Sequence, residues 1–437
     1  MSQYFHSVTL NKEKCKGCTN CIKRCPTEAI RVRNGKAKII KERCIDCGEC
    51  IRVCPYHAKK AVTDPFENIY NYKYKVALPA PTLYGQFKNV WDINLILTGL
   101  KHIGFDDVFE VARAAEIVTL ATKRIINSKK LQKPIISSAC PAVVRLITVR
   151  FPNLVKNVIP IQSPMEVAAR MVKRNISKKM GYKTEDIGVF FITPCAAKVT
   201  SSQIPIGLDT SLVDGVISMK EVYLKLVPIL DKIDHVENLS CAGMIGISWA
   251  NSGGESTALE NEQNIAVDGI HNVIKVLEEL EDEKLSDINF VEALACTGGC
   301  VGGPLTVENN FVAKNKITRM AKLISNTAVN DISNTLETVD VSWTNPITYK
   351  PILNLDNDMI KAMKKMESLE KIYNDLPGLD CGSCGAPSCR ALAEDIVRGF
   401  ANETDCIFKL REKVRGLARE MMELEGEMPP PFRKNEE

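Results

Sequence analysis

Seventeen cysteines are the residues of this chain with the most chemistry to offer, and most of them lie close together in sequence. They form three groups: eight before residue 55, five between residues 140 and 300, and four between residues 381 and 406. Thiolates at such short spacings bind metal in intracellular proteins, whereas disulfide frameworks belong to small secreted domains. The first residues show no apolar signal core, which favours a cytoplasmic protein. We therefore expect several metal centres.

The first group contains the same pattern twice. Residues 15–26 read CKGCTNCIKRCP and residues 44–55 read CIDCGECIRVCP. This pattern resembles the bacterial ferredoxin run, in which three thiolates hold one 4Fe-4S cubane and the fourth reaches the neighbouring one. It assigns the first cluster to Cys15, Cys18, Cys21 and Cys54, and the second to Cys44, Cys47, Cys50 and Cys25. The alternative, a pair of zinc sites, would need four cysteines split into two separated pairs.

Three cysteines of the second group follow strand-like runs. PIISSAC ends at Cys140, GVFFITPC at Cys195 and INFVEALAC at Cys296. Because the carboxyl ends of parallel strands share one edge of a sheet, residues remote in sequence can meet there. Cys300 follows in ACTGGCVGG, whose glycines allow close backbone approach. Four thiolates at one edge would bind a further cubane.

These segments resemble iron-only (FeFe) hydrogenases. SSACP, TPCAAK and ACTGGCVGG match the family's three signatures in order and spacing, and ALPAPT at 77–82 and KHIGFDDVFEVARAAEIVTLA at 101–121 are also similar. The resemblance implies that the four cysteines hold the cubane of an H-cluster. Cys300 would bridge to a diiron subcluster that carries CO, cyanide and a dithiolate bridge. Lys198 would hydrogen-bond one cyanide, and Pro81 and Thr82 would face the other.

The chain also departs from that family. Catalytic members have a proton-shuttling cysteine immediately before the first cluster ligand, where this chain has Ala139. The positions that continue the proton path align with Thr122, Ile159 and Ile125, and isoleucine cannot relay a proton. Three further departures from the family lie near the cluster ligands, at Leu294, Thr193 and Thr297. A retained cluster scaffold without the usual proton path resembles the sensory hydrogenases of group D, which implies slow turnover.

The third group reads LPGLDCGSCGAPSCRALAEDIVRGFANETDC over residues 376–406. Three thiolates on a Gly/Pro-rich loop and one after a helix resemble a small 4Fe-4S module, with zinc as the alternative. Beyond about Phe408 the residues predict a charged, solvated helix and a disordered tail, with docking of a partner on the helix as the alternative. The cluster ligands in this group are Cys381, Cys384, Cys389 and Cys406, which leaves Cys241 as a predicted buried, inert thiol.

The expected architecture has three parts and a tail. An α+β ferredoxin domain over 1–70 precedes a two-lobed α/β hydrogenase domain over 71–345. A small, mostly helical 4Fe-4S domain over 346–410 then leads into a charged helix and tail over 411–437. The cofactors would be four 4Fe-4S clusters and, after maturation, the diiron subcluster. Because cluster modules flank the hydrogenase domain in sequence, a branched electron route is open.

The predicted function is slow, reversible H2 cleavage, used to sense H2 or redox state. The partners would be H2 and protons, a ferredoxin-like or signalling redox protein, and maturation proteins. The oligomeric state stays open. A net charge of +4 without a basic stripe argues against nucleic acid, and no run of about 18 apolar residues suggests a membrane span. The alternative is a non-catalytic electron-transfer or scaffold protein without the diiron subcluster. A bifurcating subunit ranks last, because no GxGxxG follows a strand.

Overall fold

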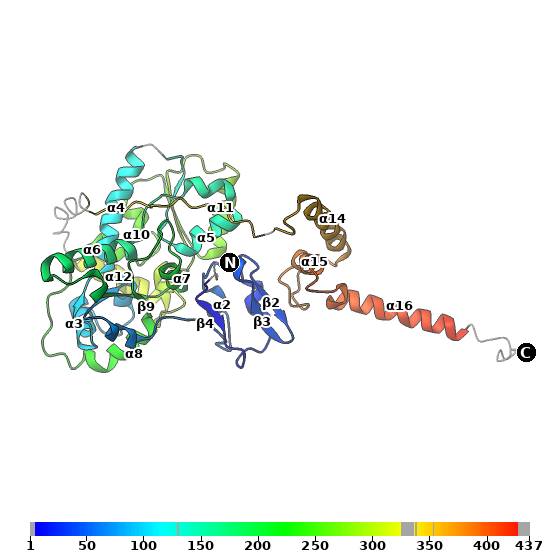
Figure 1. The fold of residues 1–437 in the computed structure, drawn as a ribbon, viewed down its shortest axis with the longest axis horizontal. Helices are drawn as coiled ribbons and strands as arrows, with labels where there is room; N and C mark the ends of the chain where they lie inside the picture. The colour runs from blue at the N-terminus through cyan, green and yellow to red at the C-terminus, as the bar shows by residue number, and fades with distance from the viewer. Residues whose placement is uncertain (1–4, 129–130, 325–335, 337–338, 353, 427–437) are drawn as a thin grey trace, which may run out of the picture.

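The computed structural model describes residues 5–128, 131–324, 336, 339–352 and 354–426. Figure 1 shows a large α/β body, a small N-terminal module beside it, and a C-terminal module on the far side of that small module. The last helix extends away from all three. In the described part of the chain, no helix has the length and apolar character needed to cross a membrane.

The N-terminal module is built from two short antiparallel strand pairs and two single-turn helices. The second strand pair, β2 (Ile30–Arg33) and β3 (Lys36–Ile39), forms a hairpin. Its turn is Asn34-Gly35, where both residues have positive φ, as a tight two-residue hairpin turn requires. The elements are β1 (Val8–Leu10), which pairs with β4 (Lys59–Ala61), β2 (Ile30–Arg33), which pairs with β3 (Lys36–Ile39), α1 (Asn20–Lys23) and α2 (Glu49–Arg52).

The large body contains two separate parallel sheets, one in each lobe. The first has the order β6-β5-β8-β9 and the second the order β10-β11-β7. Both β8 and β11 are buried along their whole length, as expected for parallel strands covered on two faces. The strands are β5 (Tyr74–Pro79), β6 (Asp107–Val108), β7 (Ile135–Ile136), β8 (Ile187–Thr193), β9 (Gly215–Ser218), β10 (Asn264–Asp268) and β11 (Phe290–Leu294).

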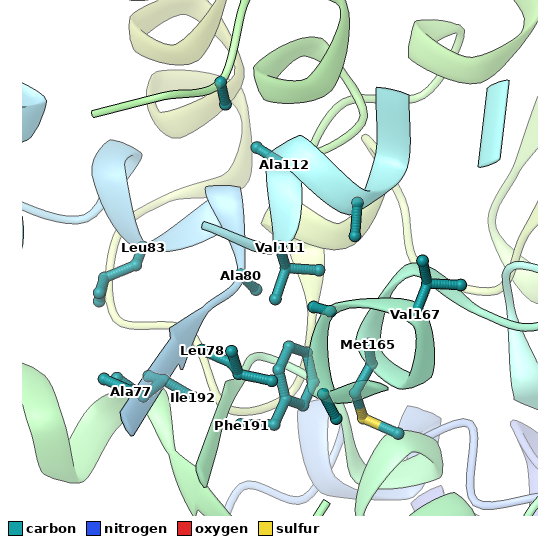
Figure 2. Packing of buried hydrophobic residues seen from close by; sticks show 14 of the residues in the cluster. Ala77, Leu78, Ala80, Leu83, Val111, Ala112, Met165, Val167, Phe191 and Ile192 are labelled. Atoms are coloured by element: carbon teal, nitrogen blue, oxygen red, sulfur yellow. The ribbon is translucent and has the colours of Figure 1, made fainter. Parts of the chain in front are cut away.

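Helices cover these sheets. They are α3 (Ile93–His102), α4 (Val111–Ser128), α5 (Pro141–Arg150), α6 (Pro164–Met180), α7 (Ala196–Gln203), α8 (Met219–Leu230), α9 (Met244–Ser248), α10 (Gly254–Ala258), α11 (Ile270–Glu281) and α12 (Asn310–Leu323). Figure 2 shows how Leu78 and Phe191 from the first sheet pack against Val111 of α4 and Met165 of α6. Phe191, Val111 and Met165 also line a cavity inside the large body, so residues of the hydrophobic core form part of the cavity lining.

The C-terminal module is mostly helical. It consists of α14 (Met359–Asp375), α15 (Cys389–Val397) and α16 (Ile407–Gly426), with the Gly-rich cysteine loop between the first two. The predicted succession of a small α+β domain, a larger α/β domain and a mostly helical C-terminal region agrees with these elements.

Candidate metal centres

The ends of three parallel strands deliver cysteines to one place between the lobes. Cys140 begins α5 four residues after β7, and Cys195 begins α7 two residues after β8. Cys296 lies two residues after β11. These three cysteines and Cys300 all line one cavity of about 100 Å³. The two lobes thus bring together four thiols that are spread over 160 residues of sequence.

The glycines around Cys300 let the backbone fold closely against its surroundings. Gly298 and Gly299 have φ angles of +87° and +99°, which other residues rarely adopt. A Cβ on Gly302 would lie 2.1 Å from the Thr297 carbonyl oxygen, and one on Gly303 would lie 2.2 Å from that of Pro194. Larger residues at these positions would displace the loop and the thiol it carries.

Burial makes thiols at this site costly to ionise. It raises the pKa of Cys195 to about 12, with added repulsion from Cys296 and Cys140. It also raises the pKa of Cys300 well above the ordinary value. Such thiols lose their protons when a metal supplies compensating positive charge, so cluster insertion and proton release are coupled.

Four further residues predicted from the sequence line the same cavity: Pro81, Thr82, Ala139 and Lys198. The Thr82 Oγ1 atom is buried and has no hydrogen-bond partner among the described residues. Burial lowers the pKa of Lys198, while Cys195, Cys300 and Cys140 oppose that shift. A buried hydroxyl without a partner and an ammonium group suit a bound group that carries hydrogen-bond acceptors and negative charge.

Two buried carboxylates that the sequence analysis did not single out also line the cavity. Glu255, at the start of α10, accepts a hydrogen bond of 2.7 Å from the Ser137 hydroxyl. Glu292, in the middle of β11, accepts hydrogen bonds from the Gly253 and Ser256 amides at 2.9 and 2.7 Å. A carboxylate inside the buried run INFVEALAC was the available signal for Glu292, whereas nothing in the loop sequence marks Glu255.

The environment of these two carboxylates raises their pKa values from the ordinary 4.5 to the neutral range. Burial and the charge of Glu292 raise the pKa of Glu255 to about 8. Burial also raises the pKa of Glu292 to about 7, with a smaller contribution from Asp268 on the partly exposed end of β10. The pair can therefore hold and release a proton near pH 7.

The residues aligned with the family's usual proton path lie elsewhere. Thr122 and Ile159 are buried and Ile125 is partly buried, and none of the three is among the described residues that line the cavity. Leu294 does line it. Thr193 instead accepts a hydrogen bond of 3.0 Å from the Cys195 amide, and Thr297 is exposed.

The other predicted ligands line three smaller cavities of about 10 to 20 Å³. One is lined by Cys15, Cys18, Cys21 and Cys54, the second by Cys25, Cys44, Cys47 and Cys50, and the third by Cys381, Cys384, Cys389 and Cys406. Burial raises the thiol pKa of Cys21 and raises that of Cys50 to about 12, and the positive charge of buried Lys59 opposes both shifts. Burial also acts to raise the pKa of Cys54, but hydrogen bonds from backbone amides and the charge of Lys59 outweigh it, so that pKa is lowered.

The C-terminal module docks on the N-terminal one. Asp395 of α15 forms ion pairs of 2.7 and 2.6 Å with Arg31 and Arg33 of the hairpin, and Glu394 pairs with buried Arg43. The Val32 amide donates a hydrogen bond of 2.8 Å to the carbonyl of Gly385 in the cysteine loop. Modules at opposite ends of the chain are thus neighbours.

The N-terminal module in turn docks on the large body beside the central cavity. Arg52 of α2 donates a hydrogen bond of 2.9 Å to the Gly302 carbonyl, next to Cys300. The Ser7 hydroxyl donates a hydrogen bond of 2.7 Å to the Ala196 carbonyl, next to Cys195. The N-terminal module therefore lies between the C-terminal module and the large body.

Cys241 corrects one expectation. The thiol was predicted to be buried because its neighbours in ENLSCAGMIGISW are apolar, but Cys241 is exposed. Its amide and that of Ala242 donate hydrogen bonds of 2.5 and 2.9 Å to the buried Glu110, so the backbone of this segment is anchored to the core although Cys241 itself is exposed.

Three family models match parts of this chain. The model for the iron only hydrogenase large subunit, C-terminal domain, matches residues 73–228 and 230–304. A 4Fe-4S dicluster domain matches residues 7–55, and a small Fe-S cluster model matches residues 376–408.

Several curated proteins are similar at low identity. Iron hydrogenase 1 of Clostridium pasteurianum is 25% identical over 373 residues, which cover 68% of this chain and 64% of that protein. The periplasmic Fe hydrogenase large subunit of Nitratidesulfovibrio vulgaris is 26% identical over 44% of this chain and 50% of its own length. The Caenorhabditis elegans protein named "Probable cytosolic Fe-S cluster assembly factor oxy-4" is 22% identical over 57% of this chain. Among solved structures, an FeFe-hydrogenase variant from Chlamydomonas reinhardtii has a TM-score of 0.47 at 15% identity, and the match covers 64% of this chain and 95% of that one.

Proposed function

Since the chain belongs to the iron-only hydrogenase large-subunit family, we propose that its central cavity holds an H-cluster and cleaves H2 reversibly and slowly. We further assign it to the sensory hydrogenases of group D. One observation carries the proposal: Cys140, Cys195, Cys296 and Cys300 share a cavity with Lys198 and the unpartnered Thr82 hydroxyl.

The donor set fits the proposed group. Four thiols suit a cubane, and the fourth, Cys300, lies on a glycine-rich loop that packs closely against its surroundings. The central cavity is about 100 Å³, whereas the other cysteine-lined cavities are about 10 to 20 Å³, so it can hold more than a cubane. Lys198 and Thr82 would hold the cyanide ligands by hydrogen bonds. When bound, the cluster would supply the redox chemistry that interconverts H2 with two protons and two electrons.

The residues of the chain would move the proton. Glu255 and Glu292 line the cavity, and their raised pKa values near 8 and 7 suit both uptake and release at neutral pH. Glu292 responds to the charge of Asp268, which lies on the partly exposed edge strand. We assign the proton route to Glu255, Glu292 and Asp268, in that order from the cavity outward.

Electrons would pass through the accessory clusters in series. The C-terminal cluster would exchange electrons with the N-terminal module through the Arg31, Arg33 and Asp395 interface. The cluster of Cys25, Cys44, Cys47 and Cys50 would pass them to the H-cluster, because Arg52 links its module to the Cys300 loop. A redox partner protein would then dock at the C-terminal module.

The missing shuttle at Ala139 supports a detector rather than a bulk catalyst. A detector needs H2 occupancy and a redox change, whereas a bulk catalyst needs throughput. Proton transfer through carboxylates would permit turnover, but at a lower rate than in family members that keep the cysteine shuttle.

The test is infrared spectroscopy and iron counting after anaerobic loading with a synthetic diiron complex. We expect bands of bound CO and cyanide in the wild-type protein. The Cys300→Ala variant should lose these bands while it keeps the iron of the N-terminal and C-terminal clusters. Absence of the bands from wild-type protein with intact cubanes would instead support a scaffold protein. The Caenorhabditis elegans relative, which is named as a cluster assembly factor, is an example of that alternative.

A further inference from the structure

Helix α16 stands apart from the rest of the molecule. It begins at Ile407, directly after the buried ligand Cys406, and extends away from the C-terminal module (Figure 1). Its first turn is fixed by an ion pair of 2.8 Å between Lys409 and Asp375 of α14. Every side chain from Leu410 to Glu425 is exposed. The first turn of the helix therefore contacts α14, and the rest of the helix packs against no other element within the described part of the chain.

The apolar residues of α16 follow a heptad pattern. Their spacing alternates between three and four residues, which places them in one stripe along the helix, at the a and d positions of a two-stranded coiled coil. The six residues are Ile407, Leu410, Val414, Leu417, Met421 and Leu424, and each is between 45% and 68% exposed. A solvated surface helix does not need this regularity over its whole length.

The charges beside the stripe change sign along the helix. The first half carries four basic residues and one acidic residue between positions 409 and 415. The second half carries one basic and three acidic residues between positions 419 and 425. Two such helices attract when they run in opposite directions, because each basic half then lies beside an acidic half. Parallel helices would set like charges together.

The edge positions of the heptad give the same preference. Lys413 and Glu420 occupy successive g positions. In an antiparallel pair g residues face g residues, so Lys413 would lie beside Glu420 of the second copy. In a parallel pair Glu420 would lie beside Glu425 of the second copy, which is repulsive.

We propose that α16 pairs with α16 of a second copy of this chain as an antiparallel two-stranded coiled coil. Val414 then packs against Leu417 of the second copy, and the layers on either side match in the same register: Leu410 with Met421 and Ile407 with Leu424. At 1.5 Å per residue the paired segment is about 30 Å long. The two bodies lie at opposite ends of it. A seam of about three heptads is short, so dimerisation depends on concentration.

The first experiment is sedimentation equilibrium of the full, cluster-loaded chain under anaerobic conditions. We expect a reversible dimer of twice 48.5 kDa. Leu417→Glu places a charge in the seam and should weaken the dimer by ~100-fold. Met422→Glu is the matched control, because Met422 is 73% exposed on the same helix but outside the stripe. It should leave the dimer intact.

Cluster absorbance and the helical circular dichroism signal check that both variants are folded. Wild-type protein that stays monomeric at every concentration, or equal weakening by both substitutions, would overturn the proposal. Wild-type association that Leu417→Glu does not weaken would also overturn it.

A charge substitution tests the direction of the pair. Glu420→Lys converts the two Lys–Glu contacts of the antiparallel pair into Lys–Lys contacts, so we expect the dimer to weaken by about fivefold. Adding Lys413→Glu should restore wild-type affinity. A dimer that tightens with Glu420→Lys alone would show a parallel pair and overturn the antiparallel arrangement.

Discussion

Two regions around the central cavity differ in what they can do with a proton. Behind Ala139, the residues aligned with the usual path are Thr122, Ile125 and Ile159, and no titratable side chain occurs among these four positions. On the side of the second sheet, Glu255 and Glu292 line the cavity with pKa values raised to about 8 and 7. The cavity has therefore lost the cysteine at position 139 as a proton donor but has titratable carboxylates on α10 and β11. Substitutions on each side test it.

The largest effect should come from the carboxylate side. Glu255→Gln keeps the shape of the side chain but cannot carry the proton, so H2 turnover of matured protein should fall by ~100-fold. Thr122→Val on the other side should leave turnover unchanged. Infrared spectra of both variants show whether the cluster is loaded. An unchanged rate in Glu255→Gln would move the proton route away from this side.

Stability should respond to pH through the same group. Because the folded-state pKa of Glu255 is about 8 and its ordinary value is 4.5, the folded protein retains a proton that the unfolded chain releases. The contribution to stability is complete below pH 4.5 and is lost as the pH rises to about 8, by on the order of a few kcal/mol. Thermal unfolding between pH 5 and 8.5 should show a steeper loss for wild-type protein than for Glu255→Gln. Parallel curves would contradict the raised pKa.

Ser137→Ala should have a smaller effect. The Ser137 hydroxyl donates to Glu255 and lowers its pKa, so removing it should move the pH profile of turnover upward by about one unit. Turnover at pH 7 should fall by about fivefold. Ser138→Ala is the matched control, because the Ser138 hydroxyl donates to the Ile161 carbonyl instead. If both substitutions shift the profile equally, the hydrogen bond to Glu255 is not the cause.

Ala139→Cys should have the smallest effect. A thiol at this position would face the cavity, but Thr122, Ile125 and Ile159 do not continue the path, so turnover should rise by less than about twofold. The rate of H2 oxidation by matured protein measures it. A large rescue would show that an outer path exists on this side and that the alignment of these positions is wrong.

The sequence predicted what depends on short spacing and on strand ends. Paired cysteine runs identify cluster modules, and cysteines were expected where parallel strands end. The prediction of a single shared edge was wrong, because β7 and β11 belong to one sheet and β8 to the other, and the cysteines meet between the two lobes. Glu255 was missed because a carboxylate in the first turn of a short helix is normally solvated. The docking of α15 on the hairpin was also missed, because Arg31 and Asp395 are 364 residues apart and only the fold brings them together.

Helix α16 shows a different limit. Its many charged residues led to the prediction of a solvated helix, and the helix is indeed exposed in the single chain. The regular apolar stripe becomes meaningful only when the structure shows that nothing in the described part of the chain covers it. Exposure of Cys241 has a similar origin, because apolar neighbours in sequence do not ensure burial in the fold.

The docking of the two terminal modules has a consequence for shortened versions of the chain. Arg31 and Arg43 are buried beneath α15, and their carboxylate partners come from Asp395 and Glu394. A chain truncated after the hydrogenase domain would expose the guanidinium groups of Arg31 and Arg43 and the hairpin backbone at Val32, which α15 and the cysteine loop now cover. The segment that carries Gly385 and α15 therefore covers part of the first domain, so a chain shortened before it to simplify spectroscopy should also expose the surroundings of the N-terminal cysteines.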